Sequence, residues 1–191
     1  VGAMPTASAS FLGQAIAMLH RRDPTVSVRT VDGITGALLP ALALERLQLV
    51  VGARLRESLP AKLRAHWLFD DPMCLVVAAG HPLARRRAPA WADCVGHPWV
   101  LPTPGHPVRS AFDAACKREG LAPPAATLDG LEIGLVLALL RHANAVNLMP
   151  ARLAMQLQRE GQVRILQGDS AQRLSIHLAT TAFVHVDHEQ H

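Results

Sequence analysis

The feature that most constrains the fold of this chain is an alternation of strand-like and helix-like segments, with hydroxyl residues where strands give way to helices. A short strand ending near Met4 precedes the hydroxyl-rich stretch 5–10, after which apolar residues recur at helical spacing. An alternating strand is expected from Val26 onward, and the turn at 32–36 leads into a second amphipathic helix. With the buried strand at 47–52, the order strand, hydroxyl, helix occurs twice. This alternation predicts an α/β fold with a mainly parallel sheet covered by helices.

The second half of the chain repeats the same order of strand, loop and helix. A strand too apolar to face water is expected at 68–78, and a strand at 99–101 leads through the tight loop 102–107 into a helix at 108–118. The remaining expected elements are a helix at 131–141, a strand at 145–149, a helix at 151–160 and strands at 163–166 and 174–180. We expect the last strand to return to the first half of the fold.

Composition excludes several classes of protein. Half of the residues are hydrophobic and 18% are charged, which is typical of compact domains and not of disordered chains. The richest apolar stretch, 133–140, is about half the length of a bilayer span, so no membrane segment is predicted. The first residues lack the pattern of a secretory signal. These observations favour a cytoplasmic setting.

Cysteine content and charge limit the possible partners. Cys74, Cys94 and Cys116 are odd in number and widely spaced, which argues against a disulfide framework and against a zinc site. The net charge of +4 comes from scattered arginines and the run 85–87, which we interpret as a solvated basic turn. Only 4% of the residues are aromatic, so the chain lacks the aromatic and basic stripe of a single-strand binder. We expect no direct nucleic-acid binding by this chain.

Hydroxyl residues stand where a doubly wound sheet binds its ligands. Thr6, Ser8, Thr35 and Thr103 follow expected strands, where the N-termini of helices point N–H groups at a ligand. The alternative is that each hydroxyl only caps its own helix. Arg54 follows a further strand, and one guanidinium among neutral donors suits a carboxylate, although it could also be an ordinary surface arginine.

No catalytic or metal-binding motif is present. The chain has no nucleophile elbow, no phosphate-binding glycine loop and no paired carboxylates in a plausible cleft. Cys94 and His97 could form a thiol–imidazole pair, but no third group is placed to orient it. His185, His188 and His191 have a spacing that could chelate a metal, and a solvated tail is the favoured interpretation. We therefore predict no catalytic residues, no metal and no cofactor.

Several motifs together resemble the effector-binding domain of LysR-type transcription regulators. The resemblance runs from Val1 to about Thr180 and is carried by these segments in order: Val1-Gly2-Ala3, Asp23-Pro24, Leu47-Gln48-Leu49-Val50-Val51-Gly52, Ala79-Gly80-His81-Pro82-Leu83-Ala84, Trp99-Val100-Leu101-Pro102, Glu119-Gly120-Leu121 and Leu148-Met149-Pro150. Two departures are Gln48, where the family usually has an acidic residue, and the tail after Thr180, which does not resemble the closing helix of the family.

The resemblance implies a type 2 periplasmic-binding-protein-like fold, with two Rossmann-like lobes joined by two crossover strands. Lobe I would hold residues 1–71 and 168–191, and lobe II residues 72–167. Pro72 and Gly168 stand where the chain would cross from one lobe to the other. The helix-turn-helix that binds DNA in such regulators is absent from this chain, so DNA binding is expected from a part that is missing here.

The resemblance also implies a ligand site and a mode of action. By position, the effector contacts are Thr6, Thr35, Arg54, Leu101, Pro102 and Thr103, with plausible walls at Ala7, Ser8, Ile34, His106, Glu132 and Met149. A small-molecule effector, either a small carboxylate or, as runner-up, a sugar, would bind between the lobes and shift the DNA-binding geometry of a homodimer, assembled as a tetramer in the full-length protein. The alternatives are a stand-alone solute-binding protein of the same fold and, more remotely, an enzyme.

Overall fold

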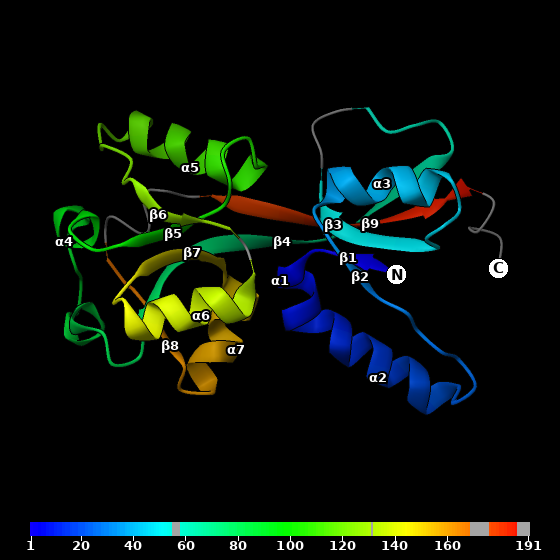
Figure 1. Cartoon of the computed structure of the whole chain (residues 1–191), viewed down its shortest axis with the longest axis horizontal. Coiled ribbons are helices and arrows are strands. Elements are labelled where there is room, and N and C mark those ends of the chain that lie inside the picture. Colours follow the sequence, from blue (N-terminus) through cyan, green and yellow to red (C-terminus); the bar gives the residue numbers. More distant parts are fainter. Residues whose placement is uncertain (55–57, 131, 169–175, 187–191) are drawn as a thin grey trace. The chain divides into compact units, whose positions relative to one another are not determined.

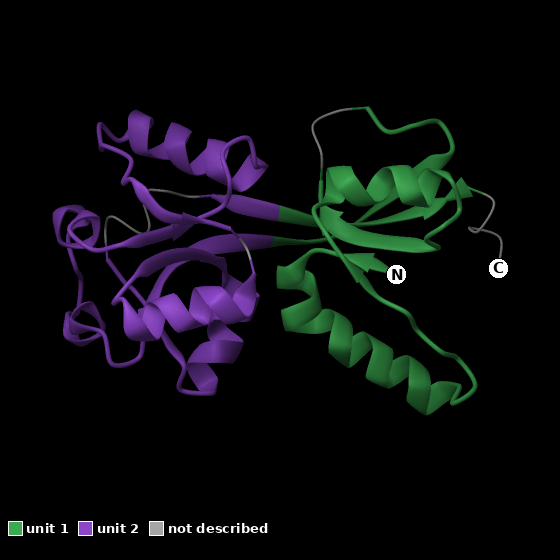
Figure 2. Ribbon diagram, in the orientation of Figure 1, with its two compact units in different colours: residues 1–70, 179–191 green, residues 71–178 purple. Residues whose placement is uncertain are grey.

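The computed structural model describes residues 1–54, 58–130, 132–168 and 176–186, and the chain divides into two compact units (Figure 2). Unit 1 contains Val1–Asp70 and Ala179–His191, and unit 2 contains Asp71–Leu178. Along the chain, the boundaries between the units fall at 70/71 and 178/179, whereas the boundaries predicted from the sequence are at 71/72 and 167/168. The strands β4 (Leu63–Ala78) and β9 (His177–His185) have residues in both units.

Unit 1 is built on a sheet with the strand order β2-β1-β3-β9. The strands β1 (Gly2–Ala3), β2 (Val31–Asp32) and β3 (Leu49–Ala53) are parallel, and β9 runs antiparallel to β3. The expected return of the last strand to the first half is therefore confirmed. The expected strand from Val26 is wrong over 26–30, because its neighbour β1 is only two residues long and offers a ladder to Val31 and Asp32 alone.

Helices cover both faces of the unit 1 sheet (Figure 1). The helix α1 (Pro5–Ala7), the π-helical turn η1 (Ser8–Leu12) and the helix α2 (Gly13–Arg22) follow one another on one face. The helix α3 (Thr35–Ala43) lies on the other face and buries Leu38, Leu39 and Leu42 against Val50 and Phe183. By contrast, α2 has no fully buried residue.

Unit 2 has a mixed sheet with helices on both faces. The strand β5 (Trp99–Leu101) is parallel to β6 (Ala126–Asp129) and to β7 (Val146–Pro150), and β4 is antiparallel to β7 and to β8 (Val163–Ile165). The helix α5 (Pro107–Arg118) covers one face, while α6 (Ile133–His142) and α7 (Ala151–Arg159) cover the other (Figure 1). The short elements η2 (Pro82–Arg85) and α4 (Trp91–Val95) lie between β4 and β5 in the chain. Neither β6 nor α4 was expected from the sequence.

Three aromatic rings form the centre of the unit 2 core. The ring centroid of Trp99 lies 5.6 Å from that of Trp91 and 5.6 Å from that of Phe112. The Trp99 indole is fully buried, and its Nε1–H donates a hydrogen bond of 3.0 Å to the carbonyl of Cys94. One side chain therefore joins β5 to both α4 and α5.

The motif at 79–84 has a structural explanation in His81. This fully buried histidine precedes η2, and its Nδ1 accepts a hydrogen bond of 3.0 Å from the Leu83 N–H. Since Nδ1 accepts, Nε2 carries the proton and donates to the carbonyl of Asn144 at 2.9 Å. Burial lowers the pKa of His81, the Asn144 carbonyl opposes this shift, and the nearby His97 adds to it. The neutral imidazole is thus the form that the fold stabilises.

The C-terminal histidines are not simply a solvated tail. His185 is buried at the end of β9, so the tail interpretation is wrong for this residue, while His188 and His191 lie outside the described residues. None of the described helices has the length and apolar character needed to cross a membrane.

Trp99→Ala is expected to lower the free energy of unfolding by about 3–5 kcal/mol, because it removes a fully buried ring and its hydrogen bond. Urea denaturation followed by circular dichroism measures the change. Trp67→Ala is the matched control, since the Trp67 side chain is 60% exposed, and a cost of less than about 1 kcal/mol is expected for it. Equal losses in the two variants would contradict this account of the core.

The free energy of unfolding of the domain is expected to decrease as the pH is lowered below about 6.5, partly because of His81. In that range the unfolded chain takes up a proton on this histidine and the native state does not, so acid favours unfolding. His81→Asn keeps an acceptor for the Leu83 N–H but cannot titrate, and it should weaken the fall in stability between pH 7.5 and 5.5, measured by urea denaturation at each pH. His142→Asn, at an exposed histidine, is the control for the substitution itself. An unchanged pH dependence in His81→Asn would rule out this assignment.

Candidate functional site

The carboxyl ends of the three parallel strands of unit 1 meet at one edge of the sheet. Ala3 pairs with both Asp32 and Val51, so β1 and β2 end at the same level, and β3 continues two residues further to Ala53. Beyond these pairs, the Met4 N–H donates to the carbonyl of Val51 at 3.0 Å, and the Gly33 N–H donates to the carbonyl of Ala3 at 3.0 Å. The segments that carry Thr6, Thr35 and Arg54 therefore all start from this edge, which we call the unit 1 strand-end edge.

Thr35 is the most deeply buried hydroxyl residue predicted for the site. It is the first residue of α3 and is 3% exposed, and its Oγ1 has no hydrogen-bond partner among the residues that the structure describes. The residue before α3 is Ile34, so Thr35 does not act as the helix N-cap, contrary to the capping alternative. Its side chain lies against Gly52: a Cβ added to that glycine would stand only 2.2 Å from Thr35 Oγ1. A buried hydroxyl without a partner costs about 1–3 kcal/mol, which makes Thr35 a candidate to bind something from outside the chain.

The first helical segment places its hydroxyls differently. Ser8 Oγ donates a hydrogen bond of 2.9 Å to the carboxylate of Asp32, and this contact ties the helical segment to the end of β2. Thr6 is half-buried and its carbonyl accepts from Ser10 Oγ at 2.7 Å, while Ala7 is buried. Ser8 also begins the π-helical turn η1, a conformation found frequently at functional sites.

Arg54 and Ile34 are the exposed members of the unit 1 set. Arg54 follows β3 directly, and its N–H donates to the carbonyl of Ala179 at 2.8 Å, which fixes the backbone while the side chain is exposed. The Ile34 side chain is 52% exposed beside the start of α3. The strand-end edge thus carries a cation and an apolar side chain together with the hydroxyls.

In unit 2, the predicted residues of β5 and β7 belong mostly to the core. Leu101 and Met149 are 0% and 2% exposed, and Pro102 is also buried, whereas Thr103 is exposed in the loop before α5. The capping alternative is wrong for Thr103 as well, because the residue that caps α5 is His106.

The two other polar residues predicted for unit 2 each cap a helix. His106 Nδ1 accepts from the Val108 N–H at 3.2 Å, and burial lowers the pKa of His106, so the neutral ring can accept this bond at pH 7. The Glu132 carboxylate accepts from the N–H groups of Leu135 and Gly134, and these two hydrogen bonds lower the pKa of Glu132.

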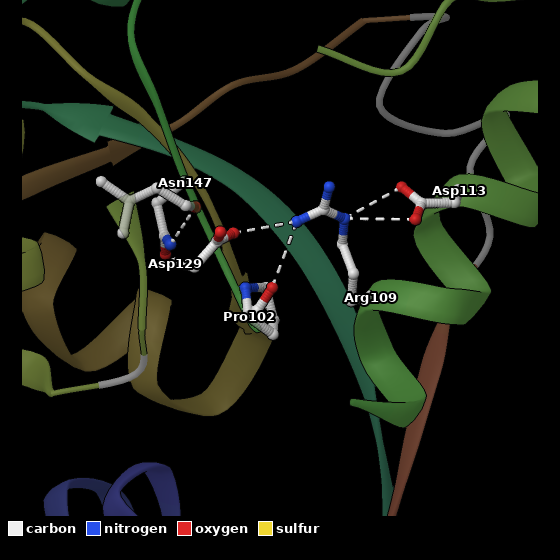
Figure 3. A network of polar contacts seen from close by, with 6 residues as sticks. Pro102, Arg109, Asp113, Asp129 and Asn147 are labelled. Carbon is white, nitrogen blue, oxygen red and sulfur yellow. Dashed lines mark hydrogen bonds and ion pairs between the residues drawn. The ribbon is translucent and has the colours of Figure 1, made fainter. Parts of the chain in front are cut away.

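Sequence reasoning missed a guanidinium that organises the ends of β5 and β6. Arg109 Nε lies 3.1 and 3.2 Å from the two carboxylate oxygens of Asp113, and its Nη1 donates to Asp129 at 3.1 Å and to the carbonyl of Pro102 at 3.3 Å (Figure 3). The i,i+4 spacing of Arg109 and Asp113 was a usable signal. The contact with Asp129 was not visible, because it depends on the pairing of β5 with β6.

The three cysteine thiols all have a raised pKa. Burial raises the pKa of Cys94 and of Cys116 to about 11, and burial likewise raises the pKa of Cys74. The ring of His97 packs against His81, with centroids 4.5 Å apart, and its backbone N–H donates to the Cys94 carbonyl. Within 1–54, 58–130, 132–168 and 176–186, no group of three or more histidine, cysteine, aspartate or glutamate residues could hold a metal ion.

Comparison with known proteins identifies the family. The family model described as "LysR substrate binding domain" matches residues 1–185. A hydrogen peroxide-inducible genes activator of Pectobacterium carotovorum subsp. carotovorum is 32% identical over 120 residues, which are 63% of this chain and 39% of that protein.

Two solved structures show the same fold. The cofactor-binding domain of the Cbl transcriptional regulator superposes with a TM-score of 0.77 at 18% identity, over 96% of this chain and 78% of that one. The effector-binding domain of QuiR in complex with shikimate gives a TM-score of 0.72 at 15% identity, over 97% of this chain and 86% of that one. The expected periplasmic-binding-protein-like α/β fold is confirmed.

This chain spans less than half the length of the curated relatives that it matches. Those relatives are transcription regulators, and the family model covers the chain from its first residue to β9. The chain belongs to the LysR family of transcription regulators and forms the substrate-binding, or effector-binding, domain of that family.

Proposed function

We propose that this domain binds a small carboxylate at the unit 1 strand-end edge and thereby controls the activity of a transcription regulator. The observation that carries the proposal is the buried, unpartnered Oγ1 of Thr35 at the first turn of α3. The first N–H groups of a helix have no partner within the helix, and they favour an anion. A carboxylate at this point would satisfy the hydroxyl and the N–H groups together.

Charge favours a carboxylate over a neutral ligand. Arg54 follows β3 at the same edge, with an exposed guanidinium that can pair with a carboxylate in a bidentate manner. QuiR, which shares the fold, is described in complex with shikimate, a carboxylic acid that also carries hydroxyl groups. A sugar is the second candidate, because Thr6, Ser8 and Thr35 offer neutral hydroxyls at this edge.

The contribution of unit 2 remains a prediction. Thr103 would supply a contact from the loop after β5, next to Leu101 and Pro102, and His106, Glu132 and Met149 are the other residues predicted for this unit. The hydrogen bond from Arg109 to the Pro102 carbonyl supports this prediction, because it holds the start of that loop in place.

Regulation would follow from differential affinity and not from catalysis. An effector shifts a regulator only by binding one of its states more tightly than the other, and a coupling of about 1–3 kcal/mol is typical. LysR regulators bind effectors and DNA. We therefore place DNA binding in another part of the regulator and its site of action in the cytoplasm.

Peroxide sensing through thiols is not favoured, although one relative is a peroxide-inducible activator. Oxidation by peroxide proceeds through the thiolate, and it selects accessible cysteines with a low pKa. All three cysteines of this chain have a raised pKa, and Cys94 and Cys116 are fully buried.

We also propose that the domain forms a homodimer through α2. LysR regulators are oligomeric, and the exposed side of unit 1 carries apolar residues that a monomer would leave in water. Met18 and Leu19 on α2 are 58% and 41% exposed, and Val31 on the edge strand β2 is 46% exposed.

Arg54→Gln and Thr35→Val should each weaken binding of a carboxylate effector about tenfold or more, since each removes a hydrogen bond and Arg54→Gln also removes a charge. A thermal-shift screen of small carboxylates, including shikimate and benzoate, and of neutral sugars would identify ligands, and calorimetry would give the dissociation constants. Arg22→Gln, at an exposed arginine on α2, is the control. If both site variants bind the hit as the parent does, the proposed site is wrong. A neutral sugar hit that is insensitive to Arg54→Gln would favour the sugar alternative.

Leu19→Glu combined with Met18→Glu is expected to convert a dimer into a monomer, because two charges would be buried in the interface. Light scattering coupled to size-exclusion chromatography measures the mass. Leu44→Glu is the control, since Leu44 is 64% exposed just after α3, and it should leave the dimer intact. A parent that is monomeric at high concentration, or a double variant that stays dimeric, would exclude α2 as the interface.

A further inference from the structure

Two buried hydroxyls in the described part of unit 1 lack hydrogen-bond partners there. They are Oγ1 of Thr35, on α3, and Oγ1 of Thr181, on β9. The two residues are 3% and 2% exposed, so bulk water does not satisfy them. Native proteins rarely leave buried hydroxyls unpaired, and each such group calls for an explanation.

The register of β3 and β9 places both hydroxyls on the same face of the sheet. Val50 pairs with Phe183, and these two side chains pack with the leucines of α3. Two residues along each strand, Gly52 pairs with Thr181. Because side chains two residues apart point to the same face, Thr181 also faces the α3 side of the sheet.

Gly52 is the point where the two hydroxyls approach each other. Thr35 occupies the position where a side chain of residue 52 would lie, with Oγ1, Cβ and Cγ2 at 2.2, 3.0 and 3.1 Å from an added Cβ. Thr181 stands directly across the ladder from this glycine. The partner side chains of a cross-strand pair have their Cβ atoms roughly 5 Å apart, so Thr35 and Thr181 are neighbours above Gly52.

We propose that Thr35 and Thr181 share one internal water molecule at this position. Neither hydroxyl reaches the other directly, whereas a water molecule between them can hydrogen-bond to both. The bridge makes Thr181 a positioning residue that orients the Thr35 hydroxyl. The relevance of that orientation to effector binding rests on the proposed function, but the bridge itself does not.

A double-mutant cycle on the ligand-free domain tests the bridge. The variants are Thr35→Val, Thr181→Val and the combination of both, and the readout is the urea midpoint of unfolding. Valine has nearly the shape of threonine, so the packing stays the same while the hydroxyl is lost. With a shared water, each single substitution should lower the midpoint, because it leaves the other hydroxyl without its partner, and the double variant should recover most of the loss.

The opposite results would overturn the proposal. If both hydroxyls are dry, each single substitution raises the midpoint, and the double variant raises it further. Additive losses would show that the two side chains do not share a partner. Thr181→Ser, which keeps the hydroxyl, should behave unlike Thr181→Val when combined with Thr35→Val, and identical behaviour of the two would also count against the bridge. Since no effector is present, these outcomes are independent of whether the proposed effector site is correct.

Discussion

The close contact between Thr35 and Gly52 is the constraint on which the arrangement of unit 1 depends. It lets α3 begin directly above the carboxyl end of β3, because any side chain at residue 52 would collide with the threonine. With α3 seated there, its leucines reach Val50 and Phe183, and the hydrophobic core of the unit closes. The same contact buries the Thr35 hydroxyl. Packing of the core and presentation of a polar group at the strand-end edge are thus two results of one missing side chain.

The two units differ in the contacts that the polar side chains at their strand ends make. In unit 1, Ser8 pairs with Asp32, whereas Thr35 has no partner and Arg54 is exposed. In unit 2, Arg109 contacts two aspartates and a carbonyl, and His106 and Glu132 cap helices, whereas Thr103 is exposed. Among the described strand-end residues considered for the site, the buried hydroxyl without a partner therefore lies in unit 1, while Arg109, His106 and Glu132 mainly fix the loops and helix ends of unit 2.

The sequence was sufficient for the elements with strong periodicity and insufficient for contacts that depend on tertiary pairing. The strand at 99–101, the helix ending at Arg118 and the helix starting at Ala151 were predicted to within a residue, because apolar spacing and flanking glycine or proline mark them. The strand β6 was missed, since its four residues alternate between half-buried and exposed without a strong apolar signal. Hydroxyls at strand ends were recognised as a group. The sequence did not show which of these hydroxyls would be buried and without a partner. That depends on the close approach at Gly52, and the role of Gly52 is visible only once β3 is paired with β9.

The π-helical turn at Ser8–Leu12 has a consequence for the surface beyond it. A wider turn accommodates about one more residue than an α-helical turn, and each residue of an α-helix advances the side chains by roughly 100° around the axis. The turn therefore sets the azimuth at which Met18 and Leu19 leave the α2 axis. If the same five residues formed a regular α-helix, this apolar side chain pair would point about a quarter of a circle away from its present direction. The irregular turn next to β1 therefore determines which side of α2 is exposed for contact with another molecule.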